Sequence, residues 1–485
     1  MGTSSETRFQ HALAVARAGN AVEARALLEE ALRQDRRHAG IRNALAVLRL
    51  EAGEVDAAVV LLEGLNKELP NVAAIRLNFG NALVAAGQVE RAIGTLERAV
   101  RLAPNDPACW YGLGRAQQTV GDPTAAVRSY REVLERLPDH REARASLAAA
   151  YNFLDDYTGG EREARQVLHT APEDAGARVN LAVALLSTGQ WSEGWHCYEA
   201  RSQTTLLDGQ RRHWPAPRWE GYGAKGDRIL VHAEQGFGDV IQFSRYLPRL
   251  RARGFHATLM CPRAMVDLFL PSGLADEVVA IGDPMPAHAW QIPLTSLPHA
   301  LALDSDVAVT GTGLPYLHAP QLGTAVQLPT VTHSCARVGI AWAGSPTHVN
   351  DRHRSCRLGD LSALLDMPGV EWVNLQLGTD GDAVLPCPRS LDARPLLTSF
   401  GATAAVLSQL DAVVCVDSAV AHLAGALGVP CLLLLPRIGL DWRWAAPCHR
   451  DWYRSVIPIR QGESWASIMG DVRRLIETRV WTPTS

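Results

Sequence analysis

Hydrophobic positions recur every 34 residues along the first two fifths of the chain; Leu113, Leu147 and Leu181 share this spacing. Each period holds two amphipathic stretches, one ending at a glycine and the next at a proline, as in 73–86 and 89–102. Glycine accepts the left-handed conformation that ends a helix, and proline cannot continue one, so each period predicts a helix-turn-helix unit. A 34-residue helical period is typical of a tetratricopeptide α-solenoid.

About six units are expected over residues 5–203, so the predicted repeat domain is 1–203. The last unit, GQWSEGWHCYEAR, is rich in aromatic residues: Trp191, Trp195 and Tyr198. Each repeat of a solenoid contacts only its neighbours. We therefore expect this last helix to dock onto whatever domain follows the array.

Residues 204–226 break the helical pattern with prolines and glycines, which predicts a linker. Short apolar runs then alternate with helical stretches, and this alternation predicts α/β architecture with parallel sheets. The region is too long for one small doubly wound sheet. We expect two Rossmann-like lobes, 227–330 and 331–485, divided within the stretch 320–335.

Composition narrows the function classes. A net charge of −4 without a basic tail argues against wholesale nucleic-acid binding. No apolar run approaches the roughly 18–20 residues that span a membrane, and the first residues lack the apolar core of a signal peptide. The nine cysteines have no CxxC or zinc spacing. The sequence therefore predicts a cytoplasmic protein with reduced thiols and no metal or bound cofactor.

Candidate chemistry lies where predicted strands end, because ligands bind at the carboxyl ends of parallel strands. The first such place is Gly236, Gly238 and Asp239, after the strand RILVHA. Glycines let the backbone approach a ligand, and the following helix start favours negative charge. Asp239 has two interpretations: an N-terminal helix cap, or a general base that deprotonates an acceptor hydroxyl.

Two further strand ends carry polar residues. Ser345 follows the strand RVGIAWAG and precedes a loop with Arg352 and Arg354. Two arginines on a flexible turn can hold a diphosphate, although a solvated basic loop explains them equally well. Gln376 ends the strand WVNLQ and is a weaker candidate for the same ligand.

The most informative strand end is DAVVCV followed by Asp417, Ser418 and a helix that Gly428 closes. Asp417 or Ser418 is expected to cap this helix, whose first turn offers free N–H groups to a phosphate. His422 lies one turn further on the same face. A lone helical histidine is more often structural, but its place beside a phosphate-binding helix end favours a functional role.

Two other motif classes receive little support from the sequence. Asp304 and Asp306 form a DxD signature of the kind that holds a metal in some sugar transferases, but three-residue matches are common by chance and no strand end supports it. The sequence has no GxGxxG and no GxxxxGK[ST], so dinucleotide-binding and P-loop functions lose support.

Four segments, in order, resemble the heptosyltransferase family (glycosyltransferase family 9) as it occurs behind bacterial tetratricopeptide arrays. They are HAEQGFGDVIQFSRYLP, VGIAWAGSPTHVNDRHRS, DAVVCVDSAVAHLAGALGVP and DWRW, and the resemblance covers about residues 190–465. It implies a GT-B fold, in which two Rossmann-like lobes face each other across a cleft, and an inverting transfer that needs no metal.

The resemblance also implies roles for single residues. Asp239 corresponds to the general base of heptosyltransferases. The helix that carries Asp417, Ser418 and His422 corresponds to the site of the donor diphosphate, and Arg352 and Arg354 correspond to the basic loop that faces it.

The chain departs from the family pattern around the implied donor pocket. Leu377 replaces a basic residue, Ser399 replaces an aspartate before Phe400, and HRDWYRS replaces a DxSPWYP-like segment. We therefore keep two hypotheses. One is a metal-independent inverting glycosyltransferase that uses a nucleotide-sugar and whose repeat array recruits a polypeptide acceptor. The other is a weakly active or inactive transferase-fold scaffold for protein–protein interaction.

Overall fold

The computed structural model describes residues 4–204, 214–321, 326–329, 335–348, 350–378, 385–387, 389–448 and 451–479. Parts of the expected linker (205–213) and of the expected lobe boundary (322–325 and 330–334) lie outside these residues, as do His449 and Arg450 of HRDWYRS. The chain forms two compact units, Met1–Pro172 and Glu173–Ser485, and each is described by itself.

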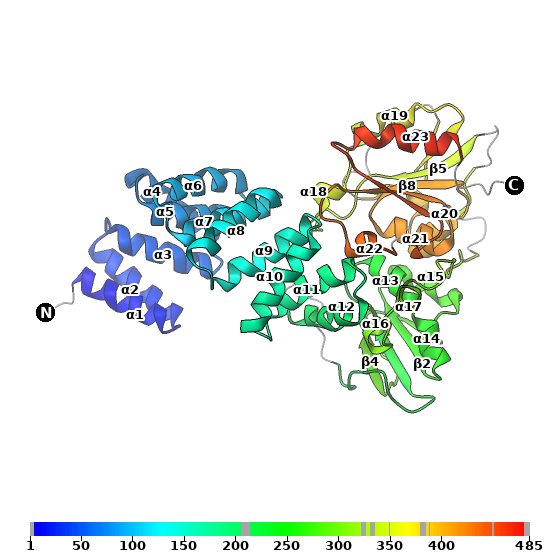
Figure 1. Cartoon of the computed structure of the whole chain (residues 1–485), viewed down its shortest axis with the longest axis horizontal. Helices are drawn as coiled ribbons and strands as arrows, with labels where there is room; N and C mark the ends of the chain where they lie inside the picture. Colours follow the sequence, from blue (N-terminus) through cyan, green and yellow to red (C-terminus); the bar gives the residue numbers. More distant parts are fainter. Residues whose placement is uncertain are drawn as a thin grey trace. The chain divides into compact units, whose positions relative to one another are not determined.

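The first unit is a helical array in which consecutive helices pack in antiparallel pairs (Figure 1). Its helices are α1 (Ser5–Arg17), α2 (Ala21–Gln34), α3 (Ala39–Glu51), α4 (Val55–Glu68), α5 (Ala73–Ala85), α6 (Val89–Leu102), α7 (Pro107–Val120), α8 (Pro123–Arg136), α9 (Arg141–Phe153) and α10 (Tyr157–Thr170). The helix pairs predicted from the 34-residue period are confirmed.

The turn inside each pair explains the glycine period. Gly19, Gly53, Gly87 and Gly121 all have positive φ, between 71° and 87°. Asp155 occupies the slot without glycine and adopts the same left-handed conformation, with φ of 61°. An aspartate tolerates this conformation better than most residues. The glycine period therefore arises because each of these turns needs a residue in the left-handed backbone conformation.

The second unit begins with two helices of the sequence period, α11 (Ala175–Ser187) and α12 (Trp191–Tyr198). The Trp191 Nε1–H donates a hydrogen bond to Asp306 at 2.7 Å, and its ring packs edge-on against Trp442 and Trp452. Trp195 packs against Trp442 and Phe243. The predicted docking of the aromatic helix onto the following domain is confirmed, and Asp306 of the DxD signature serves this contact.

A four-stranded parallel sheet follows, in the order β3-β2-β1-β4. It comprises β1 (Arg228–His232), β2 (His256–Cys261), β3 (Glu277–Ala280) and β4 (Trp290–Pro293), with helices α13 (Phe237–Ser244), α14 (Leu247–Ala252), α15 (Val266–Phe269), α16 (Leu297–Ala300) and α17 (Asp306–Thr310). The helical stretch after β1 is divided into α13 and α14, because the chain turns at Arg245 and Tyr246. Pro248 lies in the first turn of the new helix, α14, where its missing N–H costs nothing.

The second sheet has six parallel strands in the order β10-β9-β8-β5-β6-β7. Counted along the chain this is a doubly wound arrangement, in which ligands bind where the strand order reverses, here between β5 and β8. Its elements are β5 (Ala336–Ala341), α18 (Asp351–Arg354), α19 (Ser362–Leu365), β6 (Val370–Asn374), β7 (Ser390–Asp392), α20 (Phe400–Leu407), β8 (Ala412–Val416), α21 (Ala419–Leu427), β9 (Cys431–Leu435), α22 (Trp442–Ala445), β10 (Val456–Arg460) and α23 (Met469–Glu477).

Candidate active site

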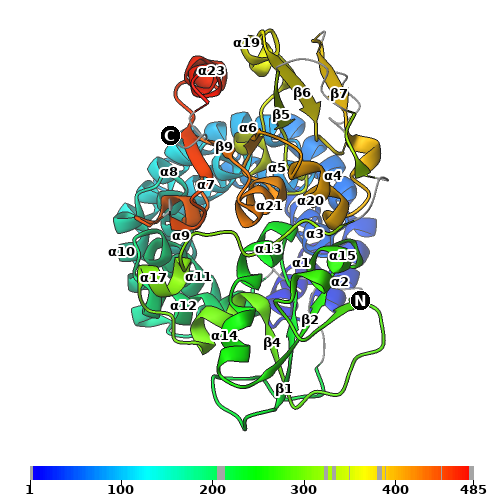
Figure 2. The ribbon, with the colours of Figure 1, turned by 90° about the vertical axis from the view of Figure 1, so that its right-hand side faces the viewer.

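Helix α13 follows β1 of the first sheet, and helix α21 follows β8 of the second sheet. The two helices lie side by side in the second unit (Figure 2). Gly238 of α13 touches His422 of α21 so closely that a methyl group on the glycine would lie 2.7 Å from the histidine Cδ2. The missing side chain at Gly238 therefore sets the distance between the two helices. It also places the first turn of α13, which holds Asp239, against α21.

Asp239 occupies the third position of α13, and its Oδ2 accepts a hydrogen bond from the Gly236 N–H at 3.0 Å. The N-cap residue is Gly236, so the interpretation of Asp239 as the N-cap residue is corrected: Asp239 caps the helix from within its first turn. Its other oxygen forms an ion pair with Arg443 of α22. Burial raises the pKa of Asp239 above its ordinary value and Arg443 opposes the rise.

Arg443 joins two carboxylates. Besides Asp239 it pairs with Asp441, whose Oδ2 lies 2.8 Å from its Nη1. Arg443 is 5% exposed, and its guanidinium lies over the rings of Trp442 and Phe243, at 4.7 Å and 5.4 Å from their centroids. Burial works to raise the pKa of Asp441, but Arg443 lowers it below its ordinary value. A buried cation between two acids is a group that can be redirected toward an anionic ligand.

Sequence reasoning missed the role of Arg443. The segment DWRW contributes to the family resemblance, but its arginine lies 204 residues from Asp239 in the chain, so no local spacing links the two. The sequence feature that could have pointed to Arg443 is its place between two tryptophans, because aromatic rings stabilise a buried cation through cation–π contacts.

Asp417 follows β8 directly, and His422 lies on α21 behind it. Burial, with the charge of Asp441, raises the pKa of Asp417 to about 6. Burial and the charge of Arg443 lower the pKa of His422 to about 3, so the imidazole is neutral at neutral pH. Its Nδ1 lies 3.1 Å from the Tyr453 hydroxyl and its Nε2 lies 4.0 Å from Asp417. His422 can therefore act as a hydrogen-bonding group and not as a cation.

The start of α21 has unused hydrogen-bonding capacity. Ser418 holds the N-cap position, but its Oγ makes no hydrogen bond within the described residues and caps nothing. Ser418 therefore occupies the N-cap position, as expected, although its side chain makes no capping hydrogen bond. The N–H groups of Ala419 and Val420 precede the first intrahelical bonds. Residues 417–420 are half-buried, so this helix end is partly exposed, although the Ser418 Oγ itself is buried. At the other end Gly428 closes α21 with φ of 77°, as expected.

Arg354 spans the point where the strand order of the second sheet reverses. Its Nη1 donates to the Asp417 carbonyl at 3.2 Å and its Nη2 to the Ser345 carbonyl at 3.5 Å. The structure thus brings Ser345, Arg354 and Asp417 together, at the carboxyl ends of β5 and β8. Arg352 lies on the same short helix, α18, and is exposed.

The side-chain amide of Gln376 forms hydrogen bonds to the protein backbone. Its Oε1 accepts from the Trp342 and Ala343 N–H groups, and its Nε2 donates to the Ala343 and Leu377 carbonyls. With four backbone partners the amide is fully engaged, so its visible task is to hold the loop before Ser345. The side chain of Leu377 beside it is exposed.

A second contact between the two sheet regions forms at the start of α20. Ser399 is the N-cap residue and donates its hydroxyl hydrogen to Asp267 of α15. The same carboxylate accepts from the Gly401 N–H at 3.1 Å. A carboxylate at this helix start therefore comes from Asp267, which sequence reasoning did not single out. Phe237 and Phe400 pack beside it with ring centroids 4.9 Å apart.

No cluster of three or more histidine, cysteine, aspartate or glutamate side chains in the described part of the chain is arranged to hold a metal ion. Among the helices that the structure describes, none combines the length and apolar character needed to cross a membrane.

Comparison with protein families gives two results. Tetratricopeptide repeat models match residues 16–74, 49–116 and 113–158, so the N-terminal region consists of these repeats. The model of glycosyltransferase family 9 (heptosyltransferase) matches a short segment, residues 397–435. That segment comprises α20, β8, α21 and β9, and so includes the open start of α21.

One curated relative is Protein FlbA from Caulobacter vibrioides, which is 27% identical over 319 residues. The match covers 59% of this chain and 52% of that protein, so the chain spans about half the length of its relative.

Solved structures with similarity include the tetratricopeptide protein TTC0263 from Thermus thermophilus, with 24% identity, a TM-score of 0.34 and coverage of 38% of this chain and 100% of that one. MamA from Desulfovibrio magneticus has 20% identity, a TM-score of 0.32 and coverage of 36% and 98%.

Proposed function

We propose that the protein is a GT-B glycosyltransferase that moves a sugar from a nucleotide-sugar to a polypeptide recruited by its repeat array. The observation that carries this proposal is the buried Asp239–Arg443 pair beside the open N-terminus of α21. A carboxylate, a redirectable cation and free helix N–H groups at facing strand ends are the parts that sugar transfer needs without a metal. The match to glycosyltransferase family 9 over α21 supports the same activity.

In this proposal the donor diphosphate binds at the start of α21. The N–H groups of Ala419 and Val420 and the free Ser418 hydroxyl donate to its oxygens, and Arg354 balances its charge. His422, neutral and in the first turns of α21, contributes a hydrogen bond rather than charge. The remaining residues complete or support the donor pocket: Gly236, Gly238, Ser345, Arg352 and Gln376.

Asp239 serves as the general base. Donor binding turns Arg443 from Asp239 toward the diphosphate, and the buried carboxylate, deprived of its cation, becomes more basic. Asp239 takes the proton of the acceptor hydroxyl while the hydroxyl oxygen attacks the anomeric carbon. The bond from that carbon to the diphosphate breaks on the opposite face, its electron pair leaves with the nucleoside diphosphate, and the anomeric centre is inverted.

The test is transfer or donor hydrolysis measured with a panel of nucleotide-sugars. Asp239→Asn should reduce turnover roughly 100- to 10,000-fold, the usual contribution of a general base, while donor binding is retained. Asp304→Asn, an exposed carboxylate of the DxD signature, is the matched control and should retain full activity. Equal turnover in Asp239→Asn and the wild type would remove Asp239 from the base role.

One observation favours the scaffold function as the second candidate. Both carboxylate oxygens of Asp239 are engaged, one by Arg443 and one by the Gly236 N–H. If that pair persists when donor binds, no base is available. Calorimetry with uridine, guanosine, adenosine and cytidine nucleotide-sugars separates the two candidates, since tight binding without turnover favours the scaffold.

The proposed enzyme acts in the cytoplasm. All nine cysteines are free thiols, and Cys415 and Cys431 remain thiols although their sulfur atoms lie 3.6 Å apart on neighbouring strands. Reduced thiols fit the redox state of that compartment.

A further inference from the structure

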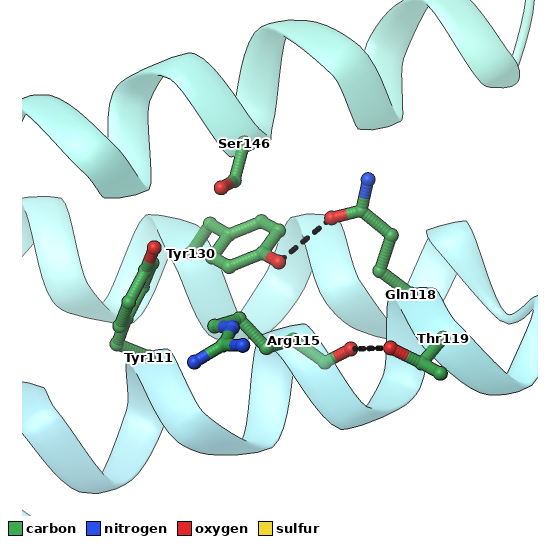
Figure 3. A pocket seen from close by; sticks show the side chains of 6 residues that line it. All are labelled: Tyr111, Arg115, Gln118, Thr119, Tyr130 and Ser146. Carbon is green, nitrogen blue, oxygen red and sulfur yellow. Dashed lines mark hydrogen bonds between the residues drawn. The ribbon is translucent and has the colours of Figure 1, made fainter. Parts of the chain in front are cut away.

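The repeat array contains a polar pocket of about 270 Å³ that the transfer chemistry does not use. Helices α7, α8 and α9 form it, and Figure 3 shows the side chains that line it. They are Tyr111, Arg115, Gln118, Thr119, Tyr130 and Ser146. Four of the six lie on one face of α7, at the spacing that places helical side chains in line.

The wall of the pocket is held in place by packing and hydrogen bonds. Tyr130 is fully buried, and a methyl group on Gly114 of α7 would lie 2.7 Å from its ring, so the ring fills the space that the glycine leaves. The Tyr130 hydroxyl donates to Gln118 Oε1 at 2.8 Å (Figure 3). These contacts fix the amide and the ring, so the wall is formed before a ligand arrives.

Arg115 is the only charged residue among the six. Within the described residues its guanidinium forms no ion pair and no side-chain hydrogen bond, and its charge acts on the Tyr130 hydroxyl. Two other arginines of the array, Arg144 of α9 and Arg162 of α10, both pair with Glu163. The pocket thus presents one exposed arginine, without an ion pair among the described residues, beside two tyrosine rings and several hydrogen-bonding groups.

We propose that this pocket binds an aspartate or glutamate side chain of the polypeptide that the array recruits, which rests on the polypeptide partner of the proposed function. An arginine fork matches a carboxylate in two parallel hydrogen bonds. The pocket holds the volume of about nine water molecules, enough for one side chain and a few waters. A phosphorylated residue carries nearly two charges and is usually bound by several cations, whereas one arginine matches one carboxylate.

The experiment uses the full chain, without nucleotide-sugar, and an array of short peptides spotted in pairs that differ only by glutamate or glutamine at one position. Bound protein is quantified for the wild type, Arg115→Gln and Arg128→Gln. The last is a matched control that removes an exposed arginine of α8 outside the pocket. The best glutamate peptides should bind the wild type roughly tenfold better than their glutamine partners, and Arg115→Gln alone should abolish this preference.

Three results would overturn the proposal: no glutamate preference in the wild type, an equal loss in both arginine variants, or a stronger preference for phosphoserine peptides. A second variant, Ser146→Glu, places a carboxylate in the pocket and should reproduce the effect of Arg115→Gln. Because binding is measured without donor, failure here leaves the transferase assay informative, and failure of transfer leaves the peptide preference measurable.

Discussion

Replacing Arg443 by methionine keeps much of the length of the side chain and removes its charge, which leaves Asp239 and Asp441 without their shared cation. The Asp239 side chain is 18% exposed and the Asp441 side chain 34% exposed, so Asp239 is the more buried partner. Breaking a buried ion pair costs about 3–5 kcal/mol, and we expect a loss of about 3 kcal/mol because Asp239 keeps its hydrogen bond from the Gly236 N–H.

The loss should depend on pH with a defined sign. Burial already raises the pKa of Asp239 above 3.8, and removing Arg443 raises it further. A carboxyl whose folded pKa exceeds its unfolded pKa destabilises the folded state above the folded pKa, and this cost disappears below the unfolded pKa. Arg443→Met should therefore be most destabilising near about pH 8 and less so near about pH 5.

Urea unfolding followed by tryptophan fluorescence at both pH values measures this difference. Arg263→Met is the control, since Arg263 pairs with Asp283 at the surface, where such pairs contribute about 0–1 kcal/mol. Equal stability of Arg443→Met and the wild type near pH 8, or the same loss at both pH values, would refute the assignment of Arg443 as the buried counter-ion of Asp239.

Three further predictions concern neighbouring contacts. Gly238→Ala places a methyl group 2.7 Å from buried His422 and should cost about 1–3 kcal/mol in urea unfolding and weaken donor binding in calorimetry; unchanged values for both would contradict the close approach of α13 and α21. Asp267→Ala removes the carboxylate at the start of α20 and should cost about 1 kcal/mol, whereas Asp304→Ala should cost nothing measurable. Because the pKa of Asp417 is raised to about 6, unfolding free energy should fall as pH rises from about 4 to 6, and Asp417→Asn should flatten this slope.

The sequence predicted the parts of the fold that depend on local chemistry. The 34-residue period located the helix pairs because each turn needs a left-handed residue, and Asp155 met that need without glycine. The strand ends were located because buried strands of a parallel sheet are continuous apolar runs. Pro248 could have revealed the break between α13 and α14, since proline favours the first turn of a new helix.

The residues of the candidate site that the sequence did not predict depend on contacts between distant segments of the chain. Arg443 and Asp267 act on residues that lie 204 and 132 positions away in the chain, and no local spacing records such pairs. Gln376 was assigned to the ligand because it ends a strand, yet its amide is engaged by backbone groups of Trp342 and Ala343, which follow β5. The sequence therefore located the loops, while the pairing of their side chains became visible only in three dimensions.

The docking of Trp191 and Trp195 has a practical consequence for dividing this protein. By sequence period the last helix pair belongs with the repeats, but by contact it belongs with the sheets. A fragment cut after residue 203 would carry two large indole rings whose natural covering has been removed, and it would be prone to aggregation. A cut near Pro172 keeps both tryptophans in the fragment that contains the sheets. One repeat array is therefore best exchanged for another at this position, in the laboratory or in evolution.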